Sequence, residues 1–518
     1  MVNFINAEEA ANLINDESAV AISSFTAISL AEDILVAIEK KFVKEQHPKN
    51  LFIFHISGVG DYKKKGLSHF SHDGLIKTIV GSHVFASPGI IPLIDENKIA
   101  SYCLPQGVAS HLTRAMAGGE DGLLTKIGLN TFADPRQDGC KMNSACDKDI
   151  VDLIKIKNKE YLFYSCFKFD FCLLKGSVAD EYGNISFENE PVLLEQLELA
   201  AATKVSGGKV IVQVHKKINN KELNPRNIKI PAHFVDYIVI GSKENTFQTH
   251  LFNEYHPELT GEQRINLDSI PPKPLDIRKI CGRRGVFEIK KDFLVNIGGG
   301  YPESVASVAA EEGIADQFLF SVESGIIGGV PVEGGIGLSY NPDVILRQPE
   351  SFDLYNGGCL DMSFLGCAQI DEMGNVNVSK FAGKIIGPGG FINITQNTKN
   401  ICFLGSFTSG KSEIIINDGN LQIIKDGNVK KFVKKVEQIT FSGIDAIKRN
   451  QNILYITERC VFHLSENGLV LIEIAPNIDI KRDILDKMEF TPIISKNIKT
   501  MDPKIFMNGK MNIKNFIF

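Results

Sequence analysis

Short apolar runs bounded by Gly, Asn, Asp or Pro recur along the chain and alternate with stretches of helical periodicity. The runs are rich in β-branched residues and have the length of strands that are buried on both faces of a sheet. Strands are expected at Leu51–Ser57, Tyr161–Leu174, Lys209–Val214, Tyr237–Ile240, Phe293–Ile297, Ile401–Leu404 and Leu469–Ile474. Helices are expected between them, as at Ser29–Lys41 and Pro302–Glu312. Strands that alternate with helices predict an α/β fold with open sheets.

A polar stretch near the middle of the chain indicates a connection between two lobes. It begins near Asn219 and ends in the Pro-Pro-Lys-Pro run of residues 271–274. The predicted division is a first lobe at 1–225, a connecting segment at 226–274 and a second lobe at 275–518.

The two lobes also resemble each other. Both contain Asp-Glu-x-Gly-Asn followed by alternating apolar residues, at Asp180–Asn184 and again at Asp371–Asn375. The glycine suits a turn that needs positive φ before a strand. We therefore expect two similar open α/β lobes, a pseudo-duplicated protein, with the active site in the cleft between them.

Composition narrows the class of protein. The chain has 518 residues, of which 43% are hydrophobic and 23% charged, with a formal net charge of −6. That balance fits a globular protein and argues against a partner surface for nucleic acid or an anionic membrane. No apolar run is long enough for a transmembrane helix, and the first residues lack the basic and apolar regions of a secretory signal. The expected location is the cytoplasm.

The cysteines point to the same compartment. The ten cysteines are scattered and none forms a CxxC pair. Free thiols in a reducing cytoplasm are expected, and neither disulfides nor a metal site.

The most distinctive chemical group is Glu323, in the stretch Phe320-Ser-Val-Glu-Ser-Gly-Ile-Ile-Gly-Gly-Val-Pro331. It follows a strand-like run and precedes a glycine-rich turn, where little bulk would hinder a substrate carbonyl. From spacing alone, a glutamate that caps the next segment or pairs with a lysine remains an alternative. Glu333, in Pro-Val-Glu-Gly-Gly, also precedes glycines and is the glutamate most easily mistaken for the nucleophile.

Two glycine clusters in the second lobe could present backbone N–H groups to an anion or oxyanion. Gly298, Gly299 and Gly300 lie between a predicted strand and a helix that Pro302 would begin. This is not the spaced glycine fingerprint of a dinucleotide fold. The second cluster, Gly387-Pro-Gly-Gly-Phe391, includes Gly389 and Gly390. Either cluster could equally be a turn that needs glycine for structural reasons.

In the first lobe, Gln106 stands between Pro105 and Gly107. A neutral amide on a rigid turn can donate to a developing oxyanion without forming a salt bridge to a carboxylate substrate. A glutamine in a surface turn is the alternative. His55 and His83 have no metal-ligand spacing and are expected to be structural.

At these residues the sequence resembles the family I CoA transferases, in the single-chain form that includes propionate and acetate CoA-transferases. The resemblance covers nearly the whole chain, and its specific parts are the Ser-Val-Glu-Ser-Gly stretch and the Pro-Gln-Gly turn. The other matching motifs are Ser57–Asp61, Gly81–His83, Gly128–Arg136, Gly387–Ile394, Tyr455–Arg459 and Glu473–Asp479.

The resemblance implies two lobes like the α and β subunits of related enzymes, the second carrying the catalytic glutamate. It implies ping-pong transfer of CoA between a short-chain acyl-CoA and a carboxylic acid such as acetate, propionate, butyrate or lactate. Glu323 would be the nucleophile and would carry CoA as a glutamyl thioester. Gln106 and a backbone N–H of Gly389 or Gly390 would contact the oxyanion, and Gly298, Gly299, Gly300 and Gly387 would bind CoA. No permanently bound cofactor or metal is implied, and a homodimer or homotetramer is expected.

The chain departs from the family pattern after its first predicted strand. The family usually has a glycine-containing loop followed by Pro-Glu, where this chain has Ser23-Ser-Phe-Thr-Ala-Ile-Ser-Leu-Ala-Glu32. Phe25 would then narrow or reshape an acyl pocket. Cys140 also replaces a common glycine. Neither change is at Glu323, so we expect CoA transfer to be kept and only the selectivity for the acyl group to differ.

Two other functions remain open from the sequence. An acyl-CoA thioester hydrolase would admit water to the glutamyl intermediate, and a silent acyl-CoA-binding protein would form no covalent adduct. The sequence does not reveal the physiological acids.

Overall fold

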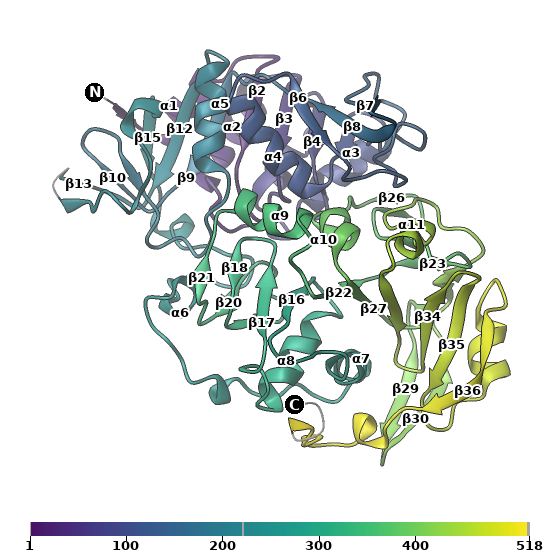
Figure 1. Cartoon of the computed structure of the whole chain (residues 1–518). Coiled ribbons are helices and arrows are strands. Elements are labelled where there is room, and N and C mark those ends of the chain that lie inside the picture. The colour runs from purple at the N-terminus through teal and green to yellow at the C-terminus, as the bar shows by residue number, and fades with distance from the viewer. Residues whose placement is uncertain (1, 220–221, 515–518) are drawn as a thin grey trace. The chain divides into compact units, whose positions relative to one another are not determined.

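The computed structural model describes residues 2–219 and 222–514. Internal contacts divide the chain into two units. The first consists of Met1–Glu262, Ile345–Phe352 and Ala382–Asn393, and the second of Gln263–Val344, Asp353–Phe381 and Ile394–Phe518. Each unit has its own main sheet flanked by helices (Figure 1).

The first unit is built on an eight-stranded sheet in which every neighbouring pair is parallel. Its order is β1 (Asn3–Ile5), β15 (Tyr237–Ile240), β12 (Lys209–Val214), β9 (Phe171–Lys175), β2 (Ala19–Ile22), β3 (Leu51–His55), β4 (Ile76–Gly81) and β5 (Ala100–Cys103). The central strands are almost wholly buried, as their continuous apolar sequences predict.

Helices and small sheets complete the first unit. The α-helices are α1 (Ala7–Leu13), α2 (Glu32–Glu45), α3 (Ile91–Asp95), α4 (Gln106–Ala117), α5 (Gln196–Val205) and α6 (Pro257–Thr260). Helix α5 packs on β9, β12 and α4, and α1 packs on α2. The small sheets contain β13 (Lys216–Ile218), β10 (Val178–Asp180), β11 (Ile185–Ser186) and β14 (Ile228–Ile230), and separately β6 (Gly122–Thr125), β8 (Lys159–Ser165) and β7 (Val151–Ile156).

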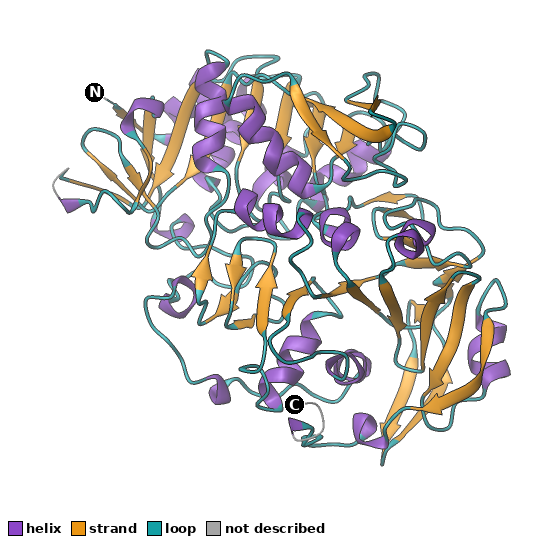
Figure 2. Cartoon of the chain, in the orientation of Figure 1, coloured by secondary structure: helices purple, strands orange, loops and turns teal. Residues whose placement is uncertain are grey.

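The second unit is built on a ten-stranded mixed sheet (Figure 2). Its order is β21 (Val344–Ile345), β18 (Ile326–Ile327), β17 (Leu319–Val322), β16 (Leu294–Ile297), β22 (Met362–Gly366), β27 (Asn400–Leu404), β33 (Asn452–Ile456), β34 (Cys460–Ser465), β35 (Gly468–Ile474) and β36 (Ile493–Thr500). The five strands from β17 to β33 are parallel, as an α/β unit requires, and β34 and β35 extend the sheet as antiparallel strands.

The remaining elements of the second half of the chain are short. The α-helices are α7 (Ile277–Val286), α8 (Glu303–Glu311), α9 (Gln348–Asn356), α10 (Phe391–Asn397) and α11 (Gly443–Lys448). The small strands are β19 (Val330–Pro331), β20 (Ser339–Tyr340), β23 (Gln369–Asp371), β24 (Val376–Asn377), β25 (Lys380–Phe381), β26 (Lys384–Ile385), β28 (Thr408–Ser409), β29 (Glu413–Asn417), β30 (Asn420–Lys425), β31 (Val429–Lys430) and β32 (Phe432–Val433).

The repeated Asp-Glu-x-Gly-Asn sequence forms the same turn in each unit. Asp180 accepts hydrogen bonds from three backbone N–H groups, at 2.8–3.0 Å, and from Nδ2 of Asn184 at 2.7 Å. Asp371 accepts from two backbone N–H groups at 3.0 Å and from Nδ2 of Asn375 at 3.0 Å. The glycine of each turn has positive φ, 103° and 77°. The aspartate thus closes a hairpin between two short strands in both units, as the sequence repeat predicted.

The observed units differ from the predicted boundaries of 225 and 275. Tyr237–Ile240 is β15, which lies between β1 and β12 in the first sheet, although it falls in the predicted connecting segment of 226–274. The strand itself was expected from its sequence, but its pairing with β1 and β12, which places it in the first sheet, is a tertiary property. The assignment of residues 345–352 and 382–393 to the first unit depends on tertiary contacts, which no local pattern reports.

Candidate functional site

Glu323 is the first residue after β17, in the tight turn that leads into β18. Gly325 closes this turn with φ of 112°, a conformation that side chains with a Cβ rarely adopt. Ser324 is buried and its hydroxyl donates to the carbonyl of Gly337 at 2.8 Å. The nucleophile predicted from the sequence therefore stands on a turn that is fixed on both sides.

The surroundings of Glu323 disfavour its charged form. The side chain is partly buried, and burial raises the pKa of Glu323 to about 7, against a smaller opposing effect of its own backbone N–H. A carboxylate poised near neutral pH in a poorly hydrated site is more reactive than one surrounded by water.

A small cavity in the second unit contains Glu323 and two of the predicted glycines. Its lining residues are Ile297, Gly298, Gly299, Glu303, Val322, Glu323, Pro331, Val332, Gly335, Ile336, Gly337 and Leu338. A Cβ on Gly299 would lie 2.9 Å from the side chain of Ile336, and Gly300 has φ of 84°. The predicted strand, glycine turn and helix entrance are present, since β16 ends at Ile297 and Pro302 precedes α8. Glu323, the candidate nucleophile, thus lines the same cavity of the second unit as Gly298 and Gly299.

Glu303 is a site residue that the sequence analysis did not single out. It is 5% exposed, and its Oε2 accepts from the backbone N–H of Gly334 at 3.1 Å. Burial raises the pKa of Glu303 to about 7, and the nearby charge of Glu333 adds to the increase. A glutamate that directly follows the proline at a glycine-rich helix entrance was the available signal, but only the fold reveals its burial.

Glu333, the other glutamate near a glycine-rich turn, makes a hydrogen bond within the second unit. Its Oε2 accepts from the hydroxyl of Ser307 at 2.5 Å, which connects the loop that contains Glu333 to α8.

In the first unit, Gln106 is the first residue of α4, and Pro105 caps the helix. The side chain is 2% exposed, so a glutamine in an exposed surface turn is excluded. Oε1 accepts from the hydroxyl of Ser82 at 3.3 Å, while Nε2 has no hydrogen-bond partner among the described residues. A buried amide donor without a partner is costly unless a ligand uses it.

The turn at Gly387–Phe391 lies against the loop that follows β4. A Cβ on Gly387 would come within 2.5 Å of the Ser82 carbonyl oxygen, so this close approach requires glycine. The Gly389 N–H donates to the same carbonyl at 3.2 Å, and the Gly389 carbonyl accepts from the N–H of Gln106 at 3.0 Å. The N–H of Gly390 makes no hydrogen bond to the residues that the structure describes. Gln106, Gly387, Gly389 and Gly390 therefore form one group.

The two histidines are packed and uncharged. Burial lowers the pKa of His55 to about 4 and the pKa of His83 to about 3. Nδ1 of His55 donates to the Ser57 carbonyl at 2.6 Å, and Nε2 of His83 accepts from the Gly58 N–H at 3.0 Å. Within residues 2–219 and 222–514, no group of three side chains is arranged to hold a metal ion.

The atypical loop after β2 adopts a conformation that favours glycine. Thr26 and Ser29 have φ of 55° and 53° although neither is glycine. The hydroxyl of Ser29 donates to Glu190 at 2.6 Å, and Glu190 forms a buried ion pair with Lys175 at 2.6 Å. Phe25 is buried. The loop therefore adopts positive φ without glycine, and the hydrogen bond from Ser29 to the buried Glu190 helps to hold it in this conformation.

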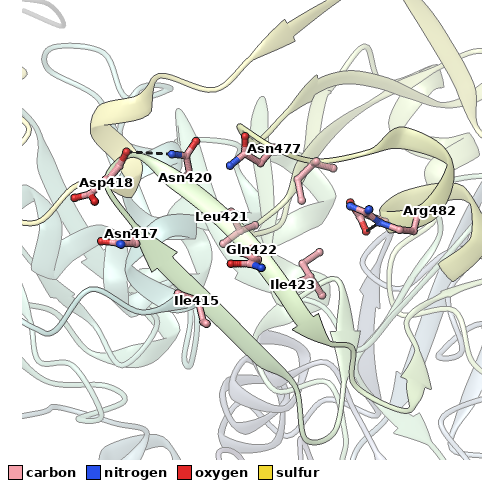
Figure 3. Close-up of a pocket in the computed structure, with 11 residues that line it drawn as sticks. Ile415, Asn417, Asp418, Asn420, Leu421, Gln422, Ile423, Asn477 and Arg482 are labelled. Atoms are coloured by element: carbon pink, nitrogen blue, oxygen red, sulfur yellow. Dashed lines mark hydrogen bonds and ion pairs between the residues drawn. The ribbon is translucent and has the colours of Figure 1, made fainter.

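A surface hollow in the second unit is separate from the predicted site (Figure 3). It measures about 650 Å³ and lies beside the β29–β30 hairpin, and Asn477 and Arg482 also line it. None of the predicted site residues lines it.

In the part of the chain that the structure describes, no helix is both long and apolar enough to cross a membrane. All ten cysteines are free thiols.

Comparison with known proteins identifies the family. Residues 4–241 match the family described as coenzyme A transferase. The chain is 44% identical to caffeate CoA-transferase of Acetobacterium woodii, with 98% of each chain covered. It is 39% identical to acetate CoA-transferase YdiF of Escherichia coli strain K12, covering 98% of this chain and 96% of the relative.

A solved structure agrees over the same length. It is the acyl-CoA transferase YdiF of E. coli O157:H7 in a thioester complex with CoA, which superposes with a TM-score of 0.92 at 38% identity and covers 99% of this chain and 97% of that one. The chain therefore belongs to the family I coenzyme A transferases, in their single-chain form, and moves CoA between an acyl-CoA and a carboxylate.

Proposed function

We propose that the chain transfers CoA from a short-chain acyl-CoA to an acid of the acetate, propionate, butyrate or lactate class, through a thioester on Glu323. The observation that carries this proposal is the carboxylate of Glu323, which stands on a fixed glycine turn with its pKa raised to about 7. The thioester complex of the related YdiF with CoA supports the same chemistry.

The steps balance without any further reactant. A carboxylate oxygen of Glu323 attacks the acyl carbonyl, the carbon–sulfur bond breaks, and an acyl–glutamyl anhydride and the CoA thiolate form. The thiolate then attacks the glutamyl carbonyl, and the donor acid leaves as a carboxylate. The acceptor acid reverses these two steps, and no net proton is gained or lost.

We assign the oxyanion contacts to the first unit. Gln106 Nε2 is buried and has no partner among the described residues, and the Gly390 N–H is likewise without an acceptor there. The Gly389 N–H already donates to Ser82, so Gly390 is the better backbone donor of the predicted pair. Each such donor contributes about 100- to 1000-fold in rate.

The glycine loop of the second unit is assigned to CoA. Gly298, Gly299 and Gly300 lead into the N-terminus of α8, where backbone N–H groups and the helix dipole favour negative charge. Gly387 is assigned to the same substrate.

We also propose that the protein is a homodimer or homotetramer, has no permanent cofactor and works in the cytoplasm. Light scattering of the purified protein would test the oligomeric state, and its absorbance spectrum would test for a cofactor.

The deciding experiment is mass spectrometry after the protein is mixed with propionyl-CoA and treated with borohydride. Reduction, or a CoA-sized adduct, should map to Glu323, and acetate should then discharge the adduct as acetyl-CoA. An unmodified Glu323 with acyl-CoA bound would indicate a binding protein, and release of CoA without an acceptor acid would indicate a hydrolase.

A further inference from the structure

Ser82 contacts both parts of the proposed oxyanion site. It follows β4, and its side chain is fully buried. Its hydroxyl donates to Oε1 of Gln106 at 3.3 Å, and its carbonyl accepts the N–H of Gly389 at 3.2 Å. Its own N–H donates to the carbonyl of Ile56 at 3.2 Å, which anchors Ser82 to the residue that follows β3 of the same sheet.

The hydroxyl contact decides which end of the Gln106 amide faces a substrate. A carboxamide has one acceptor end and one donor end of nearly equal shape, so packing alone distinguishes poorly between its two orientations. A hydroxyl that donates to Oε1 holds that oxygen in place and leaves Nε2 pointing away from Ser82. A flipped amide would present an oxygen to the developing oxyanion and repel it.

The carbonyl of Ser82 has a parallel effect on the glycine turn. Because it accepts the Gly389 N–H, the Gly390 N–H is left as the donor without an acceptor among the described residues. The close approach of the turn to this carbonyl depends on the absence of a side chain at Gly387.

We propose that Ser82 is a positioning residue that orients the Gln106 amide and the Gly389–Gly390 turn for transfer; this rests on the proposed function of Gln106. The hydroxyl and the carbonyl have separable roles, since replacement by alanine removes only the hydroxyl. A neutral hydrogen bond of this kind corresponds to about a 3- to 10-fold effect on rate.

The test is a double-mutant cycle on the rate of adduct formation with propionyl-CoA in a single turnover. Ser82→Ala should lower this rate about 3- to 10-fold, with the apparent affinity for propionyl-CoA changed less than about 2-fold. In the Gln106→Ala background the same change should have no further effect, because the amide that it orients is gone. A merely structural serine would give the same loss in both backgrounds.

Ser101→Ala is the matched control. Ser101 is a fully buried serine on the neighbouring strand β5, and its hydroxyl has no partner among the described residues. This variant should react at the wild-type rate. Equal rates for Ser82→Ala and wild type, or additive losses in the cycle, would overturn the role of Ser82 while wild-type trapping at Glu323 still supports the proposed function. Failure of wild-type trapping would instead remove the proposed function and this inference with it.

Discussion

The backbone N–H of Gln106 donates a hydrogen bond of 3.0 Å to the carbonyl oxygen of Gly389. The first N–H groups of a helix lack intrahelical acceptors, and Gln106 is the first residue of α4. The turn at Gly389 therefore satisfies a donor that would otherwise be buried and unpaired. The Pro-Gln-Gly and Gly-Pro-Gly-Gly motifs, which the sequence singled out separately, are thus connected by a hydrogen bond that the start of α4 needs.

Replacement of the nucleophile should abolish transfer. Glu323→Ala removes the group that carries CoA, and the rate of acetyl-CoA formation from propionyl-CoA and acetate should fall at least about 10⁴-fold. The thermal midpoint should stay near the wild-type value, because this charge is disfavoured in the folded protein.

Glu333→Ala is the paired variant. It removes the contact with Ser307 and should lower stability by about 1 kcal/mol while retaining transfer. Loss of transfer in Glu333→Ala with full activity in Glu323→Ala would reverse the assignment.

Adduct formation should depend on pH with an apparent pKa near 7. Only the carboxylate form of Glu323 is a nucleophile, and burial raises its pKa to about 7. The single-turnover rate should therefore rise between pH 5.5 and 7 and level off above about pH 8. Rapid mixing with propionyl-CoA at a series of pH values measures this directly.

Glu303→Gln distinguishes the two glutamates of the cavity, because burial raises the pKa of Glu303 to about 7 as well. If Glu323 sets the profile, the Gln variant keeps the same midpoint. A midpoint that disappears in Glu303→Gln would assign the titration to Glu303 instead.

The strands were the most predictable part of the fold, because buried parallel strands have continuous apolar sequences. Lys209–Val214 and Tyr237–Ile240 form β12 and β15 as predicted. The run at Tyr161–Leu174 was wrongly expected to be one strand and is two, β8 and β9, in different sheets. A polar interval within an apolar run does not tell which sheet each half will join.

The candidate site residues that the sequence singled out are those with a distinctive local sequence, and the ones that it missed depend on burial. Glu323 stands on a turn that Gly325 closes, and Gln106 begins a helix directly after Pro105. Glu303 and Ser82 lie next to motifs that the sequence singled out, but their burial and their contacts with residues distant in the chain come from the fold. Burial and amide orientation are tertiary properties, so a single sequence carries no direct signal for them.

The loop after β2 should depend on one of its serines and not on another. Ser29 donates to the buried carboxylate of Glu190, so Ser29→Ala should lower the free energy of unfolding by about 1–3 kcal/mol. Ser24 is also buried, but its hydroxyl has no partner among the described residues, and Ser24→Ala should change stability by less than about 0.5 kcal/mol. Denaturant unfolding followed by fluorescence compares the two, and equal effects would show that the bond to Glu190 contributes nothing.

A buried carboxyl group in the first unit should make stability fall as pH rises. Burial raises the pKa of Glu195 from 4.5 to about 8, although the hydroxyl of Ser110 donates to it at 2.6 Å. Between these two values the folded state binds a proton that the unfolded state has lost, so this group destabilises the fold progressively from about pH 4.5 to 8. Glu195→Gln keeps the shape and cannot ionise. Its thermal midpoint should therefore exceed that of the wild type more at pH 8.5 than at pH 5.5, and a constant difference across this range would show that Glu195 does not titrate on folding.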